Sequence, residues 1–194
     1  MIIWLNGAFG AGKTQTAYEL HRRLPGSFVY DPEEAGFFIR RCMPQALSKP
    51  DFQDYPMWRA CNYEMLAYMA AAYEGVILVP MTVTNPDYYH EMIGRLGETG
   101  TVWHFILSAE RETLRRRLRS RLEGRNSWAA RQIDRCLAAF AAEIPGISIK
   151  TDDLTVAQTA EEIARRAGMS LLPGRRGRLR RTLTRLAVQI RHIR

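Results

Sequence analysis

Residues 7–14 of this 194-residue chain read Gly7-Ala8-Phe9-Gly10-Ala11-Gly12-Lys13-Thr14, which matches the phosphate-binding pattern G-x-x-x-x-G-K-T. The apolar residues 2–5 precede this stretch, and a helical pattern with apolar residues at positions 17, 20 and 24 follows it. Because glycine has no Cβ, the three glycines allow the backbone to curl so that successive N–H groups converge on phosphate oxygens. A strand, this loop and a helix in that order predict a binding site for a nucleoside triphosphate.

Each part of the loop has an expected role. The N-terminus of the following helix adds partial positive charge, Lys13 is long enough to reach the β- and γ-phosphates, and the Thr14 hydroxyl can ligate Mg²⁺. We therefore expect ATP and Mg²⁺ as cofactors. The expected nucleotide-binding residues are Gly7, Ala8, Phe9, Gly10, Ala11, Gly12, Lys13, Thr14 and Gln15.

Short apolar runs alternate with helical patterns along the rest of the chain. We predict strands at residues 2–6, 28–30, 76–79, 101–107 and 147–149. Helical patterns cover residues 13–24, 32–47, 51–73 and 155–167, another helix opens at Asn85-Pro86, and Ser108 is expected to cap an Arg-rich helical region. This alternation predicts an α/β fold with a parallel sheet covered on both faces. The phosphate loop, Asp31, residues 82–85 and Ser108 would then share the carboxyl edge of the sheet, where such folds bind ligands.

The charge of the chain is concentrated at its end. The net charge is +8, yet residues 1–172 contain as many acidic as basic side chains, whereas residues 173–194 contain eight arginines and no acid. We therefore divide the chain into a domain of residues 1–172 and a basic C-terminal segment of residues 173–194. Three widely spaced cysteines without a C-x-x-C pair indicate neither a metal site nor a disulfide framework.

The C-terminal segment has the pattern of a basic amphipathic helix. Its apolar residues fall on one narrow helical stripe: Leu179, Leu183, Leu186, Ile190 and Ile193. Arginines flank or oppose this stripe, a pattern typical of a helix that lies in a membrane interface. Two alternatives remain, because the stripe could pack on the body or a partner subunit and the arginines could bind RNA. We favour an anionic membrane surface, expect no nucleic acid, and predict a cytoplasmic protein held at the inner face of the cell membrane.

Two groups of residues could act in phosphoryl transfer. Asp31 ends the second predicted strand, where a carboxylate can accept a proton from a substrate hydroxyl or order Mg²⁺; alternatively, it only caps a helix. Arg117, Arg121 and Arg125 are spaced four residues apart, so their guanidinium groups can project together from a lid of about residues 115–128. About half of the arginines in this region would instead face solvent.

Residues 51–62 interleave aromatic and polar side chains, a composition that suits a pocket for a ring-bearing, hydroxylated ligand. The candidate substrate residues are Asp54, Tyr55, Trp58, Arg59 and Asn62. Ordinary core packing is the alternative for Phe52 and Trp58. The strand at 76–79 leads into Pro80-Met81-Thr82, with no carboxylate where a second metal-ordering acid often lies.

Several blocks of this sequence together resemble the tunicamycin-resistance protein family. They are residues 2–10, 12–17, 30–33, 55–59, 79–82, 126–130 and 132–136, and the basic amphipathic C-terminus also matches. The resemblance implies ATP binding, association with membranes, and protection against tunicamycin, a lipid-tailed nucleoside antibiotic. It also implies a fold like that of the nucleoside-monophosphate, gluconate and shikimate kinases, which is a P-loop fold with a five-stranded parallel sheet and a lid.

The residues and the resemblance lead to one hypothesis with one alternative. As a phosphotransferase, the protein would hold ATP·Mg²⁺ with Lys13 and Thr14 and deprotonate a drug hydroxyl with Asp31. The lid arginines would neutralise the transferring phosphoryl group. As a binding protein, it would sequester tunicamycin in an ATP-dependent manner without modifying it.

Overall fold

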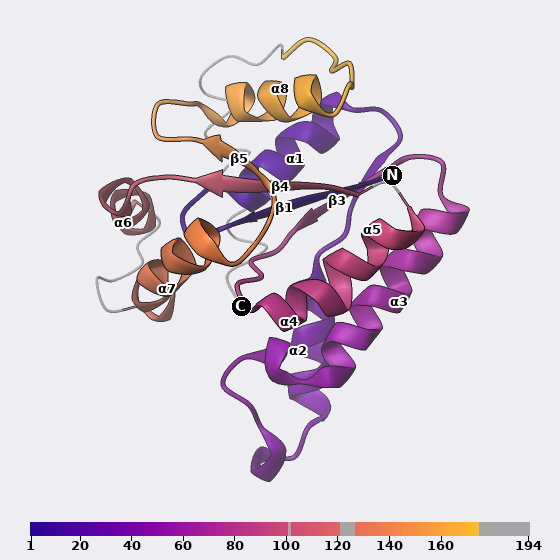
Figure 1. The fold of residues 1–194 in the computed structure, drawn as a ribbon, viewed down its shortest axis with the longest axis vertical. Coiled ribbons are helices and arrows are strands. Elements are labelled where there is room, and N and C mark those ends of the chain that lie inside the picture. The colour runs from indigo at the N-terminus through magenta and orange to yellow at the C-terminus, as the bar shows by residue number, and fades with distance from the viewer. Residues whose placement is uncertain (101, 121–126, 175–194) are drawn as a thin grey trace.

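A five-stranded, entirely parallel sheet forms the centre of the molecule (Figure 1). The computed structural model describes residues 1–100, 102–120 and 127–174. The strands lie in the order β2-β3-β1-β4-β5, and their bounds are β1 Ile2–Gly7, β2 Ser27–Val29, β3 Val76–Pro80, β4 Val102–Ser108 and β5 Ile147–Lys150. β1 lies at the centre, where Ile3 pairs with Leu78 on one side and with Trp103 on the other. The five predicted strands and their parallel arrangement are confirmed.

Helices cover both faces of this sheet. Side chains alternate along the buried strands, so each strand contributes apolar residues to both faces, and both faces need a covering layer. Ile3 and Leu5 share one core cluster with α1 (Lys13–Arg23), α6 (Arg111–Arg119), α7 (Trp128–Ala142) and α8 (Val156–Arg166). Ile2 and Trp4 belong to a second cluster. It includes residues of α2 (Pro32–Cys42), α3 (Pro56–Ala72), a π-helical turn (His90–Gly94) and α5 (Arg95–Thr99). The short helix α4 (Pro86–Tyr89) leads into the π-helical turn.

Prolines explain where two predicted helices differ from the structure. The helix predicted for residues 32–47 ends at Cys42, because Pro44 favours an extended backbone at Met43. Likewise, α3 begins at Pro56 rather than near residue 51, since the residue before a proline disfavours the helical region. The intervening chain forms two 3₁₀ turns, Gln45–Leu47 and Phe52–Asp54.

The predicted helix starts are largely as the sequence indicates. Asp31 and Asn85 accept backbone N–H groups at the starts of α2 and α4, and Thr155 forms a capping box with Gln158 at the start of α8. Besides the later start of α3, Ser108 differs from its prediction, because it lies in β4 and donates a hydrogen bond to Ile149 O instead of capping a helix. None of the helices within the described ranges is long and apolar enough to cross a bilayer.

Candidate nucleotide and substrate site

The phosphate loop leaves β1 in a conformation that requires glycine. Gly7 and Gly10 have φ values of 141° and 86°, which L side chains rarely adopt. A Cβ on Gly7 would lie 2.5 Å from Leu107 O, and one on Gly10 would lie 2.9 Å from Leu114 O. The backbone therefore runs against β4 and α6 with no room for a side chain at these two positions.

The loop ends at a helix N-terminus that no side chain caps. Gly12 occupies the N-cap position of α1 and has no side chain to accept the first N–H groups of the helix. These groups and the helix dipole favour an anion at this point. The cradle thus fits the phosphates of a nucleotide.

Lys13 folds back over the loop. Its ammonium group donates to Gly7 O and Ala8 O at 3.0 and 3.1 Å and lies 5.4 Å from the centre of the Phe9 ring. The Phe9 ring in turn meets Trp128 edge-on, with 5.0 Å between the ring centres. Lys13 therefore lies where phosphates would bind, and Phe9 connects the loop to the start of α7.

A buried amide joins the loop to its neighbours. Asn6 Oδ1 accepts from Gly7 N and Val83 N, each at 2.9 Å, and Asn6 Nδ2 donates to Val83 O at 2.9 Å. Asn6 Nδ2 also lies 3.2 Å from His104 Nε2, and Thr82 Oγ1 donates to Gly7 O at 2.9 Å. All four hydrogen-bonding positions of the amide are used, so the base of the loop is fixed to β4 and to the segment after β3.

His104 is held neutral in this network. Burial lowers the pKa of His104 to about 4, and the hydrogen bond to Pro145 O opposes this shift. Because the carbonyl at 2.7 Å can only accept, Nδ1 carries the proton and Nε2 accepts from Asn6.

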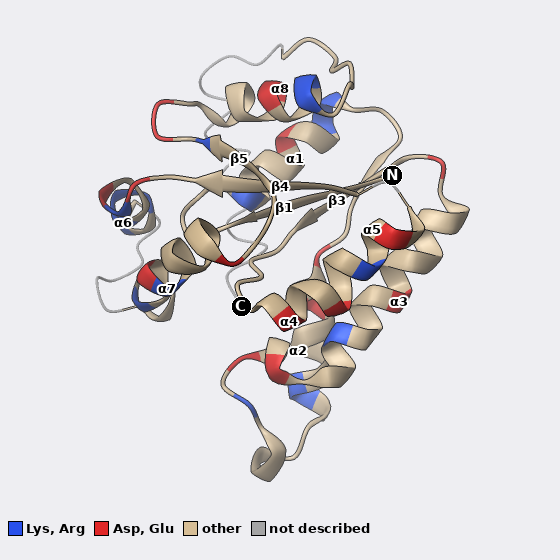
Figure 2. Ribbon diagram, in the orientation of Figure 1, with Lys and Arg blue, Asp and Glu red and all other residues tan. Residues whose placement is uncertain are grey.

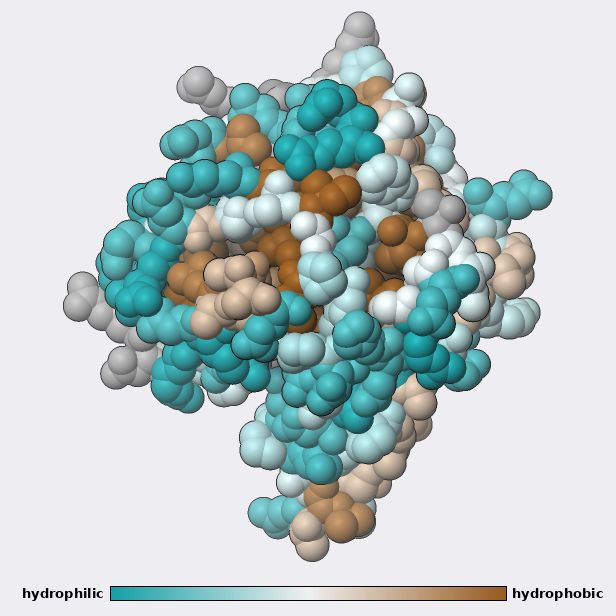
Figure 3. All heavy atoms as spheres, viewed as in Figure 1, coloured by the Kyte–Doolittle hydropathy of each residue, from teal (hydrophilic) through white to brown (hydrophobic). Residues whose placement is uncertain are grey.

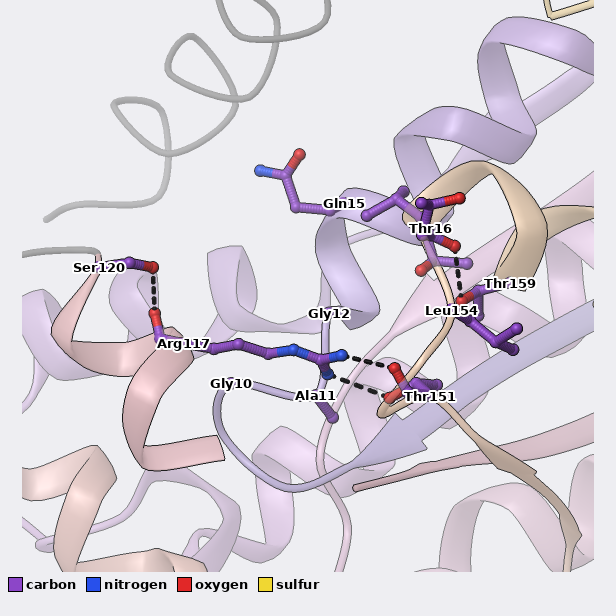
Figure 4. A pocket seen from close by; sticks show the side chains of 12 residues that line it. Gly10, Ala11, Gly12, Gln15, Thr16, Arg117, Ser120, Thr151, Leu154 and Thr159 are labelled. Atoms are coloured by element: carbon purple, nitrogen blue, oxygen red, sulfur yellow. Dashed lines mark hydrogen bonds between the residues drawn. The ribbon is translucent and has the colours of Figure 1, made fainter. Parts of the chain in front are cut away.

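One cavity opens on the α8 side of the loop and has a volume of about 210 Å³ (Figure 4). Five of its twelve lining residues carry a hydroxyl group; the lining consists of Gly10, Ala11, Gly12, Gln15, Thr16, Arg117, Ser120, Thr151, Leu154, Thr155, Val156 and Thr159. Arg117 extends across it from α6, and its guanidinium group donates to Thr151 Oγ1 at 3.0 Å and to Thr151 O. We call this space the donor cavity, because it continues from the phosphate cradle.

A second cavity of about 320 Å³ opens on the α2 side of the same loop. Its lining combines four aromatic rings with acidic, basic and hydroxyl groups: Phe9, Glu33, Phe37, Arg40, Pro50, Asp51, Phe52, Gln53, Met81, Thr82 and Trp128. We call it the acceptor cavity. Phe9 of the phosphate loop is part of its wall, so the loop separates the two cavities.

The other predicted catalytic residues are only partly within the described structure. Asp31 follows β2 at the carboxyl edge of the sheet, where its side chain accepts from Glu33 N at 3.0 Å. Thr14 lies in the first turn of α1. Arg121 and Arg125, with most of the predicted lid, fall outside the described residues. Of the three lid arginines, Arg117 is therefore the one that the structure places in a cavity.

None of the five predicted substrate residues is in the lining of the acceptor cavity. Trp58 and Asn62 are fully buried, and Trp58 Nε1 donates to Pro32 O. Asn62 accepts from the Tyr30 hydroxyl, whose pKa burial raises to about 12. Arg59 pairs with Glu91 and donates to Gln53 O. The bond from Arg59 to Gln53 supports the cavity wall, and a direct substrate role for these residues stays a prediction.

The remaining two substrate candidates are also engaged within the protein. Asp54 accepts from the Tyr88 hydroxyl at 3.0 Å, and burial is the main cause that raises the pKa of Tyr88. Tyr55 is buried and bonds to the backbone of residues 47 and 49. Neither side chain lines the acceptor cavity.

Several lining residues were missed in the sequence. Glu33 has the sequence context of an acid in the first turn of a helix, and Thr151 and Thr159 carry no local motif. The one available signal was position, because residues 82–85 and the end of the last strand both lie at the carboxyl edge of the sheet. Among the described residues, no group of three or more His, Cys, Asp or Glu side chains is arranged to hold a metal ion.

Comparisons with known proteins agree with this architecture. Residues 2–143 match the family model described as an AAA domain, and no curated protein sequence matches the chain significantly. The tunicamycin resistance protein of Deinococcus radiodurans is 35% identical, with a TM-score of 0.76, and the match covers 89% of this chain and 98% of that one.

Two kinases share the fold at lower identity. A gluconokinase from Sinorhizobium meliloti is 18% identical with a TM-score of 0.59, and the match covers 86% of this chain and 93% of that one. Shikimate kinase from Bacteroides thetaiotaomicron is 19% identical with a TM-score of 0.58, covering 87% of this chain and 99% of that one. These likenesses establish a P-loop kinase fold.

Proposed function

Because the chain belongs to the tunicamycin-resistance protein family of P-loop kinase-like proteins, we propose that it protects cells by ATP-dependent phosphorylation of a tunicamycin-like nucleoside antibiotic. One observation carries this proposal: the phosphate loop is a wall common to two cavities. Phosphoryl transfer needs a donor and an acceptor on opposite sides of the transferring group, and this arrangement provides a space for each.

On the donor side, the loop amides and Lys13 would hold the phosphates. Lys13 already lies within the cradle, where its ammonium group would exchange the carbonyl oxygens of Gly7 and Ala8 for phosphate oxygens. The Thr14 hydroxyl would ligate Mg²⁺, which neutralises charge on the β- and γ-phosphates when bound. Arg117 spans the cavity, and together with Arg121 and Arg125 it would stabilise charge on the transferring group.

On the acceptor side, Asp31 would accept the proton of the attacking hydroxyl. The rings of Phe37, Phe52 and Trp128 suit a planar base, and the polar groups between them suit sugar hydroxyls. Trp58 and Arg59 would support the wall of the acceptor cavity. The centre of the Trp58 ring lies 5.2 Å from that of the Phe52 ring, and Arg59 donates to Gln53 O.

The location of the protein is part of the proposal. The basic amphipathic segment 173–194 would hold a cytoplasmic protein at the inner face of the membrane, where an antibiotic with an apolar tail concentrates. This segment lies almost wholly outside the described residues, so the proposal depends on its sequence pattern alone.

A second function is favoured by one specific observation. β3 runs into Pro80-Met81-Thr82, so no carboxylate follows this strand to help order a metal ion. A site with fewer metal-ordering groups is better suited to binding than to rapid turnover. The alternative is therefore ATP-dependent sequestration of the drug without chemical change.

Mass spectrometry separates the two functions. Protein, Mg·ATP and tunicamycin are incubated together, and the drug is examined for the mass increase of one phosphate group. We expect the phosphorylated drug with the native protein and none with Lys13→Ala. Unmodified drug, together with measurable binding of the drug, would support sequestration and refute the kinase proposal.

A further inference from the structure

Residues 37–50, which we call the tip, form the end of the molecule furthest from the sheet (Figure 1). The tip comprises the second half of α2 and the 3₁₀ turn Gln45–Leu47. Two large apolar side chains in it face solvent: Phe38 is 60% exposed and Leu47 is 61% exposed. Apolar groups accordingly appear at the lowest point of the space-filling view (Figure 3).

The tip is held in place by hydrogen bonds. The buried Tyr55 hydroxyl donates to Leu47 O at 3.2 Å and accepts from Lys49 N at 2.8 Å. Arg40 donates to Pro50 O at 2.8 Å and lies 5.1 Å from the centre of the Phe52 ring. Leu47 is therefore presented to solvent by a fixed backbone, although burying its side chain would be favourable.

The charge of the tip is of one sign. Residues 37–50 contain Arg40, Arg41 and Lys49 and no acidic residue, although Asp51 follows directly; the ribbon of this part of the chain carries blue segments in Figure 2. Exposed apolar side chains that lie among basic ones, without acids, are complementary to a surface with negative charge on its outside and an apolar layer just below that charge. An anionic lipid bilayer has both properties.

We infer that the tip docks onto an anionic bilayer, with Phe38 and Leu47 inserted in the interface and Arg41 and Lys49 on lipid phosphates. This contact is separate from the one proposed for residues 173–194. Phe37, Arg40 and Pro50 belong to both the tip and the acceptor cavity, so docking brings the cavity to the lipid surface. That consequence for substrate delivery rests on the proposed function, whereas the docking itself does not.

A fluorophore at the tip tests insertion directly in the full-length chain. In a Cys42→Ser, Cys61→Ser background, Leu47→Cys is labelled with NBD and mixed with vesicles of phosphatidylcholine with or without phosphatidylglycerol. Phe28→Cys is the matched control, because Phe28 is 48% exposed and lies outside the tip, on β2. With anionic vesicles, we expect a blue shift and a several-fold rise in NBD emission for the label at position 47. We expect no such change for the label at position 28, or for either label with neutral vesicles.

Charge-matched variants test the electrostatic part. The double substitution Arg41→Gln, Lys49→Gln should weaken association with anionic vesicles by about fivefold per residue at low salt. Arg135→Gln, Lys150→Gln removes the same charge from exposed positions elsewhere and should have little effect. Phe38→Ser, Leu47→Ser should reduce association at least about tenfold.

The outcomes are distinct. If the protein sediments with vesicles while the label at position 47 still reports water, the C-terminal segment alone carries membrane association and the inference is wrong. If the label responds to protein concentration without lipid, and sedimentation velocity gives a dimer that Phe38→Ser, Leu47→Ser dissociates, the tip is an interface between copies and the inference is again wrong. Neither result bears on whether the drug is phosphorylated.

Discussion

The donor and acceptor cavities share one wall and differ in almost everything else. The donor cavity is smaller and is lined by threonine and serine hydroxyls around a glycine loop. The acceptor cavity is larger and combines aromatic, charged and other polar side chains from α2, residues 50–53, the segment after β3 and the start of α7. A general phosphate donor needs few specific contacts beyond its phosphates. A particular acceptor needs a shaped and chemically varied surface.

If the two cavities hold donor and acceptor as proposed, this difference locates specificity for the drug on the acceptor side of the loop. The loop itself is fixed through Asn6 and Thr82 to the segment that forms part of the acceptor wall. A change in the shared wall should therefore affect both cavities, whereas a change in either lining should affect one. The predictions below test this division, beginning with the wall.

Lys13→Ala should have the largest effect, because it removes the cation from the shared wall. We expect phosphoryl transfer and ATP affinity each to fall at least about a thousandfold, and resistance to disappear. The variant should still fold, with a melting temperature lowered by about 4–8 °C, since the two lost hydrogen bonds to Gly7 O and Ala8 O are worth about 1 kcal/mol each. Calorimetric titration with an ATP analogue and a melting curve measure the two effects. A folded variant that still protects cells fully would exclude nucleotide binding from the function.

Asp31→Asn should remove the base and keep the helix cap. Asparagine caps helices as well as aspartate does, so stability should hardly change, while transfer should fall by about 10²–10⁴-fold. Glu33→Gln is the matched comparison, because Glu33 lines the acceptor cavity two residues further along the chain. A larger loss of rate for Glu33→Gln than for Asp31→Asn would identify Glu33 as the base and Asp31 as a cap only.

The phosphate loop and the acceptor cavity also differ in how far the sequence predicts them. The loop is contiguous, and the positive φ values of its glycines are a local backbone requirement that the sequence pattern records directly. Its structure, the five parallel strands and the caps of α2, α4 and α8 could all be predicted, because each depends on neighbouring residues.

The acceptor cavity could not be assembled in this way. Its lining comes from separate segments whose positions depend on where α2 ends and where Pro56 starts α3. The phase of α3 turns Trp58, Asn62 and Leu66 into the core, which composition alone does not reveal. Phe52 and Gln53 line the cavity because they lie in a 3₁₀ turn before the helix, within a stretch that the sequence suggested was helical.

Lowering the pH should reduce the stability of the folded protein through protonation of His104, which belongs to the hydrogen-bond network at the base of the phosphate loop. Its pKa is about 4 in the folded protein and near 6.5 when unfolded, so between these values the unfolded state binds the extra proton. Stability should therefore fall as the pH is lowered from about 6.5 to about 4, by up to about 3 kcal/mol. Protonation would also place an N–H against the Asn6 amide N–H.

Urea unfolding at several pH values measures this loss. His104→Gln is the control, because glutamine can still accept from Asn6 and does not titrate in this range. We expect the variant to lose less stability than the native protein over the same interval. An equal loss in both would assign acid sensitivity to other groups and remove His104 from the account.

The smallest effects should come from the two linings, and they should be independent of each other. Trp128→Ala removes a ring from the acceptor cavity, so the KM for the drug should rise about tenfold, as expected for loss of a stacking surface. Leu154→Ala widens the donor cavity and should raise the Kd for ATP about fivefold, because roughly 1 kcal/mol of apolar contact is lost. Each variant should leave the other ligand's affinity within about twofold, and the double variant should show the sum of the two free-energy changes. Steady-state kinetics with each ligand varied in turn provides both measurements.

Independence of the two linings is least secure at Trp128. Its ring contacts Phe9 of the loop, and Phe9 lies beneath the ammonium group of Lys13. If Trp128→Ala weakens ATP as much as it weakens the drug, the ring supports the shared wall, and the division into two separate linings fails on that side.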